Sequence, residues 1–220
     1  MIMFQELFWL IFSYLIGSFP NGYLIPKLLK GIDIRKVGKE KLSSSNIIHQ
    51  VGILAGVFSF LIDMTKGTIA VYFAQLFHFS FVFVALSGIA ALAGQMWPIF
   101  LRFWGGRGGA TSFGVLLIIA PKIIGIVILI LLISKLISKD KGGPIGMSLC
   151  YILAIILGFF PALLNLEIIE AKIVIIFAIF SFILVHLQRL LGKPGSLRNI
   201  KDKKIIIYRL FLDRDSIKIV

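Results

Sequence analysis

Two long segments without charge limit what this chain can fold into. Residues 79–100 and 147–166 contain no Asp, Glu, Lys or Arg, and a helix needs about 20 mostly apolar residues to cross a bilayer. Of the 220 residues, 59% are hydrophobic and only 15% are charged, whereas soluble domains carry about 25% charged residues. The apolar runs are continuous rather than alternating, which excludes membrane-spanning strands. We therefore expect an all-α integral membrane protein, because helices satisfy their own backbone in lipid.

Further helices are expected near residues 4–24, 47–77, 112–137 and 170–191. Two of these segments contain interruptions. Asp63 and Lys66 fall inside 47–77, which is either one tilted helix or a helix preceded by a short membrane-dipping segment. Pro121 falls inside 112–137 and can begin a separate helix.

The net charge of +13 is concentrated in four segments: 25–41, 101–112, 135–141 and 193–220. A basic balance fits nucleic acid, anionic lipid or an anionic substrate, but membrane proteins also collect Lys and Arg in cytoplasmic loops. Placing all four segments inside requires the split at Pro121. This predicts seven membrane segments, with the N-terminus outside and the C-terminus inside. Residues 1–192 would form one transmembrane domain, and residues 193–220 a basic cytoplasmic tail.

An ionisable residue inside a span is costly and is a candidate for function. Asp63 and Lys66 are three residues apart, so on a helix they share a face and can pair. A structural ion pair and a substrate contact both remain open for them.

The segment "LRFWGGRGGATSFG", residues 101–114, places glycines and Arg107 immediately before a helix that opens at "ATS". Free N–H groups at a helix N-terminus beside an arginine suit an anion, and Arg107 can bind a phosphate with two hydrogen bonds. The alternatives are an ordinary glycine turn and close packing of helices through small residues.

Other kinds of site find little support in the sequence. His49, His78 and His186 lack metal-ligand spacing, so we expect neither a metal nor a cofactor. No G-x-S-x-G segment is present. The single cysteine, Cys150, allows no internal disulfide. An enzyme of this composition would act by positioning phosphorylated groups and stabilising their charge.

Several short motifs occur in a fixed order along the chain. They comprise Gly17, Ser18 and Pro20; Asp33 and Arg35; Gly38 and Asn46; Asp63, Lys66 and Gly67; and Gly105, Gly106, Gly108, Ala110, Thr111 and Gly114. In this order the chain resembles the bacterial acyl-phosphate:glycerol-3-phosphate acyltransferase family, of the PlsY type, over residues 10 to 192. That resemblance implies a seven-helix enzyme of the bacterial cytoplasmic membrane.

The resemblance also implies a reaction and its partners. The family transfers an acyl chain from acyl phosphate to the 1-hydroxyl of glycerol 3-phosphate and makes lysophosphatidic acid. The expected partners are these two substrates and membrane lipid, without nucleic acid, and no protein partner is indicated. The resemblance gives catalytic charge to Arg107, Lys66 and Arg35. It gives phosphate binding to Ser18, Asn46, Gly105, Gly106, Gly108, Thr111 and Ser112. Further site candidates are Asp63, Ser148, His186 and Arg189.

Some motif positions depart from the family pattern. Arg107 replaces a lysine, Gln95 replaces a histidine, and "KEKLSSS" replaces the interior of a glycine loop. At the last motif, His186 falls where asparagine is expected and Ile183 where histidine is expected. An alternative function is therefore a catalytically impaired paralogue that binds phospholipid precursors or a partner enzyme. A small transporter of phosphorylated metabolites is a third possibility, although no inverted repeat is visible.

Overall fold

A computed structural model of the chain describes residues 2–138, 142–164, 166–191, 206, 209–210 and 213. These residues form helices joined by short loops, with no strand among them. Four stretches in this part of the chain are long and apolar enough to cross a membrane: Phe4–Lys30, Ile53–Leu76, Phe81–Leu101 and Ile168–Leu191. The all-α membrane fold expected from the sequence is confirmed.

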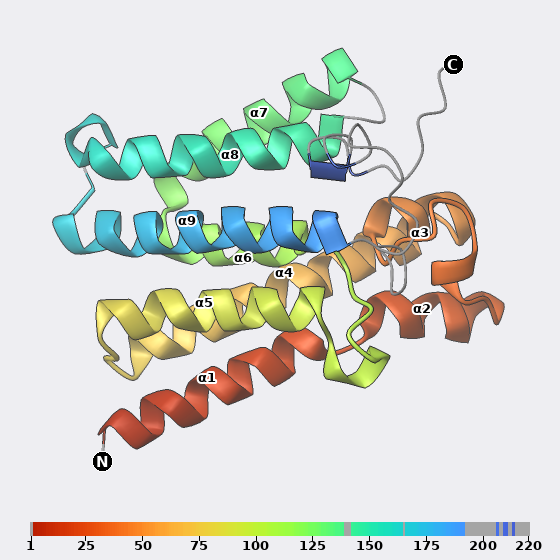
Figure 1. The fold of residues 1–220 in the computed structure, drawn as a ribbon, viewed down its shortest axis with the longest axis horizontal. Coiled ribbons are helices and arrows are strands. Elements are labelled where there is room, and N and C mark those ends of the chain that lie inside the picture. Colours follow the sequence, from red (N-terminus) through yellow and green to blue (C-terminus); the bar gives the residue numbers. More distant parts are fainter. Residues whose placement is uncertain are drawn as a thin grey trace. The chain divides into compact units, whose positions relative to one another are not determined.

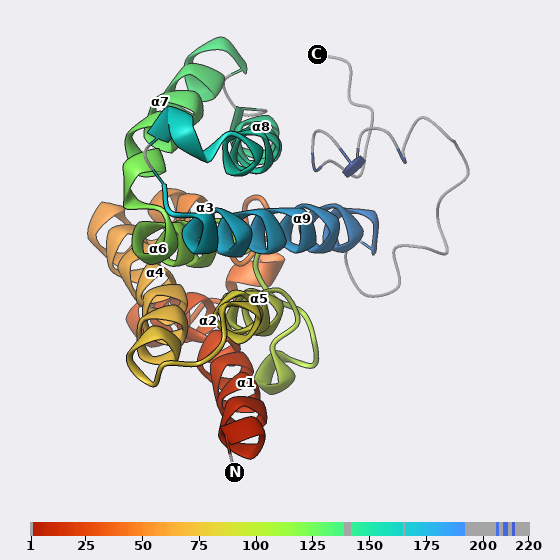
Figure 2. The ribbon, with the colours of Figure 1, turned by 90° about the vertical axis from the view of Figure 1, so that its left-hand side faces the viewer.

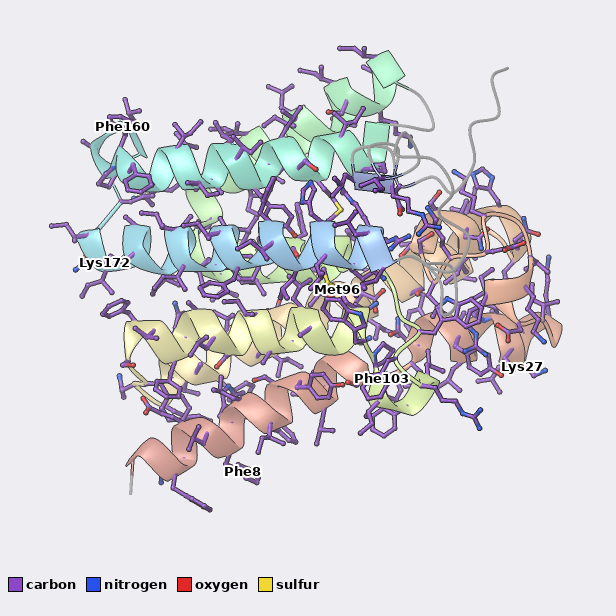
Figure 3. The ribbon with its side chains drawn as sticks, viewed as in Figure 1. Phe8, Lys27, Met96, Phe103, Phe160 and Lys172 are labelled. Atoms are coloured by element: carbon purple, nitrogen blue, oxygen red, sulfur yellow. The ribbon has the colours of Figure 1, made fainter. Side chains whose placement is uncertain are left out.

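The chain divides into two compact units, Met1–Ile119 and Ala120–Val220. The helices of the first are α1 (Ile2–Ser18), α2 (Asn21–Lys30), α3 (Ser44–Gln50), α4 (Ile53–Leu76), α5 (Phe81–Met96) and α6 (Gly109–Ile119), with 3-10 turns η1 (Ile34–Lys36) and η2 (Ile99–Leu101). Helix α1 packs along α5, and α4 packs on both α5 and α6 (Figures 1 and 2). Phe8 on α1 and Lys27 on α2 lie toward opposite ends of this unit (Figure 3). Arg35, in the loop that follows α2, contacts the Trp104 ring, so the basic segments 25–41 and 101–112 meet at the end that carries α2.

Two predicted helices of the first unit are each divided in the structure. The helix expected over 4–24 ends at Ser18, and α2 begins at Asn21, because a residue before proline avoids the helical region and Pro20 follows Phe19. The stretch 47–77 contains α3 and then α4, separated at Gly52, whose φ of 142° suits only glycine. For residues 47–77, the structure thus has a short helix followed by a long one, as one of the two alternatives predicted. The other alternative, a single tilted helix, is wrong.

The second unit contains α7 (Pro121–Ser138), α8 (Gly142–Phe159), the 3-10 turn η4 (Pro161–Leu164) and α9 (Ile168–Leu191). Helix α8 packs against α7 and α9. The expected split at Pro121 is confirmed, since α6 ends at Ile119 and α7 begins with the proline. Among the described residues, seven helices have 11 residues or more, α1 and α4 to α9. The tail 193–220 lies outside the described residues except at 206, 209–210 and 213, and the inside–outside orientation stays a prediction.

Helices α4 and α6 approach so closely that glycine is required on both. A Cβ atom on Gly114 would collide with the carbonyl oxygen of Met64, and one on Gly67 would collide with that of Thr111. Small residues allow such close contact between membrane helices, where lipid provides no hydrophobic drive for association. Small-residue packing, one of the alternatives for the glycine-rich segment, therefore applies to Gly114.

Replacing Gly114 with alanine is expected to lower the free energy of unfolding by about 1–3 kcal/mol, because the new methyl group meets backbone that cannot move aside. Thermal unfolding in detergent, followed by circular dichroism, measures the change. Gly125→Ala is the matched control, since nothing lies within 4 Å of its added Cβ and alanine favours a helix over glycine. Equal midpoints for the two variants would contradict this account of the helix contact.

Candidate active site

The ammonium group of Lys66 is the centre of a buried polar cluster in the first unit. Its Nζ donates to Asp63 Oδ1 at 2.9 Å, Asn21 Oδ1 at 2.5 Å and Gln95 Oε1 at 2.7 Å, and to the carbonyl oxygen of Phe19 at 2.6 Å. Of the two alternatives left open for Asp63 and Lys66, the structure shows the ion pair. Four chain segments meet at this one nitrogen: α4, α2, α5 and the Phe19–Pro20 link.

This geometry limits what Lys66 can do. A lysine ammonium has three protons, and four oxygens already surround them. Only 3% of the residue is exposed. A phosphate oxygen would therefore have to displace one of these acceptors to bind Lys66 directly.

The glycine-rich loop lies against the C-terminal end of α5. Gly106 N donates to the carbonyl oxygen of Gln95 at 2.9 Å, so this backbone donor, expected to face a phosphate, is used within the protein. A Cβ on Gly105 would strike the carbonyl oxygens of Gln95 and Met96. Gly108 has a φ of 73°, which glycine adopts without strain and which turns the chain into α6. Arg107 is half-buried between these glycines.

Two hydroxyl groups beside the Lys66 cluster are buried without a hydrogen bond. Ser18 Oγ and Thr111 Oγ1 have no partner within the described part of the chain, although buried polar groups are nearly always paired. Ser18 precedes Phe19, whose carbonyl binds Lys66, and the Thr111 carbonyl lies against Gly67. Ser13 and Ser181 share this lack of a partner, so the position of Ser18 and Thr111, rather than the lack alone, makes them candidates for ligand contact. Ser112, the next residue of α6, is also buried.

Asp33 and Arg35 form a two-bond ion pair at η1. Arg35 Nε donates to Asp33 Oδ1 at 2.9 Å and Nη2 donates to Oδ2 at 2.8 Å, and the Arg35 backbone N–H donates to Oδ1 at 3.0 Å. The side-chain hydrogen bonds from Arg35 hold the pKa of the Asp33 carboxyl below its usual value. The same bonds raise the pKa of Arg35. A carboxyl group whose pKa is lowered on folding stabilises the fold at any pH above the ordinary pKa of Asp. This stabilisation is lost as the pH falls through the lowered pKa. The pair therefore stays charged at neutral pH.

Asn46 organises the loop that contains η1. Its Nδ2 donates to the carbonyl oxygens of Ile34, Val37 and Lys41 at 3.1–3.2 Å, and its Oδ1 accepts from Lys39 N at 3.0 Å. Asn46 is fully buried. The side chain expected to contact substrate is thus committed to the backbone of residues 34–41, where it shapes the loop.

The second unit brings Ser148, His186 and Arg189 together between α8 and α9. Ser148 Oγ lies 3.3 Å from His186 Nε2 and accepts from Arg189 Nη1 at 3.0 Å. Arg189 Nη2 donates to the Pro144 carbonyl at 2.9 Å. His186 Nδ1 lies 2.8 Å from the Phe182 carbonyl, which can only accept, so Nδ1 carries a proton in that contact. Three of the four further candidates named from the sequence, Ser148, His186 and Arg189, therefore form one cluster.

The family model for glycerol-3-phosphate acyltransferase matches residues 7–192. This range contains all the motif residues of both units. The chain belongs to the glycerol-3-phosphate acyltransferase family.

Relatives and solved structures agree with this assignment. Glycerol-3-phosphate acyltransferases of Prochlorococcus marinus strains MIT 9211 and MED4 are each 41% identical over 133 residues, 59% of this chain. These alignments span 65% and 67% of the two relatives, about two thirds of their length. The crystal structure of PlsY, an integral membrane glycerol 3-phosphate acyltransferase, in its glycerol 3-phosphate form is 27% identical, with a TM-score of 0.68 over 90% of this chain and 100% of that one. Its lysophosphatidic acid form gives a TM-score of 0.67 over 85% of this chain and 92% of that one.

Four residues that contact Lys66 or Arg35 in this chain were not chosen as site residues from the sequence: Asn21, Gln95, Tyr23 and Trp104. Asn21 and Gln95 are amides in otherwise apolar stretches, and polar groups in a span usually have a partner. That signal could have identified both. Tyr23 and Trp104 carry no such signal, because aromatic residues are frequent throughout the chain.

Proposed function

We propose that this family member transfers an acyl chain from acyl phosphate to the 1-hydroxyl of glycerol 3-phosphate and forms lysophosphatidic acid. The hydroxyl oxygen attacks the acyl carbonyl carbon, and the bond between that carbon and the phosphate oxygen breaks. The hydroxyl proton leaves with inorganic phosphate. Neither substrate needs a cofactor for this exchange.

One observation carries the proposal: chain segments from the first motif, from the motif around Asp63 and from the end of α5 converge on Lys66. Lys66 Nζ contacts residues 19, 21, 63 and 95. Two buried hydroxyls without a partner, those of Ser18 and Thr111, belong to residues next to this cluster: Ser18 precedes Phe19, and the Thr111 carbonyl lies against Gly67. Arg107 and Arg35 add positive charge on neighbouring loops. Positive charge and hydroxyl donors are the groups that bind phosphate and stabilise a departing phosphate.

We assign roles to the residues of this site as part of the proposal. Arg107, Arg35, Ser18, Thr111 and Ser112 supply charge and hydrogen bonds to phosphate groups. The loop glycines at 105, 106 and 108 allow the loop backbone to lie close against α5. Lys66 with Asp63 and Asn46 hold the segments in place. Ser148, His186 and Arg189 form the polar cluster of the second unit. We place the protein in the bacterial cytoplasmic membrane.

Purified protein supplied with acyl phosphate and glycerol 3-phosphate is expected to release inorganic phosphate and lysophosphatidic acid in equal amounts. Mass spectrometry of the lipid and a phosphate assay measure both products. Omitting glycerol 3-phosphate is the control, and replacing acyl phosphate with acyl coenzyme A tests the donor.

The replaced motif residues favour one competing function, a paralogue that binds precursors without turnover. Gln95 accepts a hydrogen bond from Lys66 at a position where the family pattern has histidine. On that alternative, glycerol 3-phosphate raises the unfolding temperature while no lysophosphatidic acid forms. That result would overturn the catalytic proposal.

A further inference from the structure

Arg35 is held by two aromatic rings from different segments. Its guanidinium carbon lies 4.9 Å from the centroid of the Tyr23 ring and 5.0 Å from that of the Trp104 ring. Tyr23 belongs to α2, Arg35 to η1, and Trp104 to the loop directly before Gly105. Both distances fall within the range of cation–π attraction, about 6 Å. The contact therefore ties the glycine-rich loop to the η1 loop.

The ion pair with Asp33 leaves part of the guanidinium available. An arginine side chain has five N–H donors in one plane. Two of them, on Nε and Nη2, bind the Asp33 carboxylate, so three N–H donors point elsewhere. Asp33 fixes one edge of the plane, and the two rings restrict its tilt. The remaining donors are thereby held in a fixed plane before any ligand arrives, and two of them, one each on Nη1 and Nη2, point out together from the edge next to Asp33.

We propose that Trp104 and Tyr23 are positioning residues that orient Arg35 toward the phosphate of glycerol 3-phosphate. This inference rests on the proposed function and deepens it by placing the acceptor's phosphate at Arg35. The aromatic faces contribute no donor themselves. They restrict the Arg35 side chain in the free protein, so that less conformational entropy is lost when a ligand binds. Asp33 occupies one edge of the guanidinium and thereby decides which edge is left for the ligand. A planar group with parallel N–H donors suits two oxygens of one phosphate.

Loss of the Trp104 ring should therefore affect one substrate more than the other. Trp104→Leu is expected to raise the KM for glycerol 3-phosphate about 3- to 30-fold, which corresponds to ~0.6–2 kcal/mol, within the range of cation–π contributions. The KM for acyl phosphate and kcat should stay within about twofold of wild type. Trp104→Phe keeps a ring over Arg35 and should recover most of the loss.

Phe103→Leu provides the matched control. Phe103 is the preceding residue, is 58% exposed, and takes no part in the described contacts of Arg35. Both positions exchange an aromatic ring for leucine in the same loop. The control should leave the KM for glycerol 3-phosphate unchanged. An equal rise for both variants, or a fall in kcat without a change in KM for Trp104→Leu, overturns the inference.

A binding measurement separates this inference from the proposed reaction. Titrating glycerol 3-phosphate into wild-type protein should change tryptophan emission as the phosphate engages Arg35 beside the Trp104 ring. The change should disappear in Trp104→Phe, which retains Trp9 and Trp97 as unchanged references. A wild-type signal without turnover supports the phosphate site and contradicts acyl transfer. Turnover without any change in emission contradicts the placement of the phosphate at Arg35.

Discussion

Arg107→Ala is expected to lower kcat/KM for acyl transfer about 100- to 1,000-fold, the usual effect of removing one charge-stabilising donor from a preorganised site. Arg107 follows Gly105 and Gly106 and precedes the turn at Gly108 that opens α6. The backbone just before it is fixed to the end of α5 by the hydrogen bond from Gly106 N to the Gln95 carbonyl. Phosphate release at saturating acyl phosphate and varied glycerol 3-phosphate measures the loss.

Two further variants make this result specific. Arg107→Lys should fall between wild type and alanine, because lysine keeps the charge and loses the planar fork of donors. Arg102→Ala removes an exposed arginine from the same connection between α5 and α6 and should retain wild-type activity. If Arg107→Ala and Arg102→Ala behave alike, the glycine-rich loop does not stabilise the reacting phosphate.

Lys66→Met is expected to reduce the free energy of unfolding by about 3–5 kcal/mol, because it leaves the buried Asp63 carboxylate without its cation. Asp63 is only 6% exposed, so water cannot replace the lost partner. The methionine is of similar length, which separates the loss of charge from the loss of packing. Unfolding in detergent with increasing denaturant measures the change.

The double variant Asp63→Asn/Lys66→Met tests the cause of this instability. Removing both charges should restore part of the stability lost in Lys66→Met, since replacing a whole buried ion pair costs less than breaking it. The single Asp63→Asn variant completes the cycle and gives the coupling between the two side chains. A double variant no more stable than Lys66→Met would show that the amide and carbonyl contacts of Lys66, rather than its pairing with Asp63, hold the segments together.

Local sequence signals predicted which segments are helical better than they predicted where each helix begins and ends. The proline rule located the division at Pro121, and charge spacing predicted the Asp63–Lys66 contact on one helix face. The division after Ser18 was missed, and the one at Gly52 was left between two alternatives, because the hydrophobic pattern continues across both. Continuous apolar runs show that a segment is in lipid, but they carry no periodic signal that marks where one helix stops.

The site was predicted less completely for a related reason. Asp63 and Lys66 are neighbours in sequence, whereas Asn21 and Gln95 reach Lys66 only when α2 and α5 pack on α4. Asn46 was chosen as a substrate ligand from its place in a motif, and the structure shows its amide bound to the surrounding backbone. A motif indicates that a residue matters at a position, and only tertiary contacts reveal whether it serves the ligand or the loop.

The ion pair on α4 also bears on how this helix enters the membrane during synthesis. Each isolated Asp or Lys near the middle of an inserting helix costs about 2.5–3.5 kcal/mol. Asp63 and Lys66 lie on the same helix, one turn apart, at 2.9 Å. They can therefore neutralise each other as soon as α4 forms, before α5 and its Gln95 have been translated. The same pair that later anchors four segments thus allows α4 to be inserted early as an electrically neutral unit.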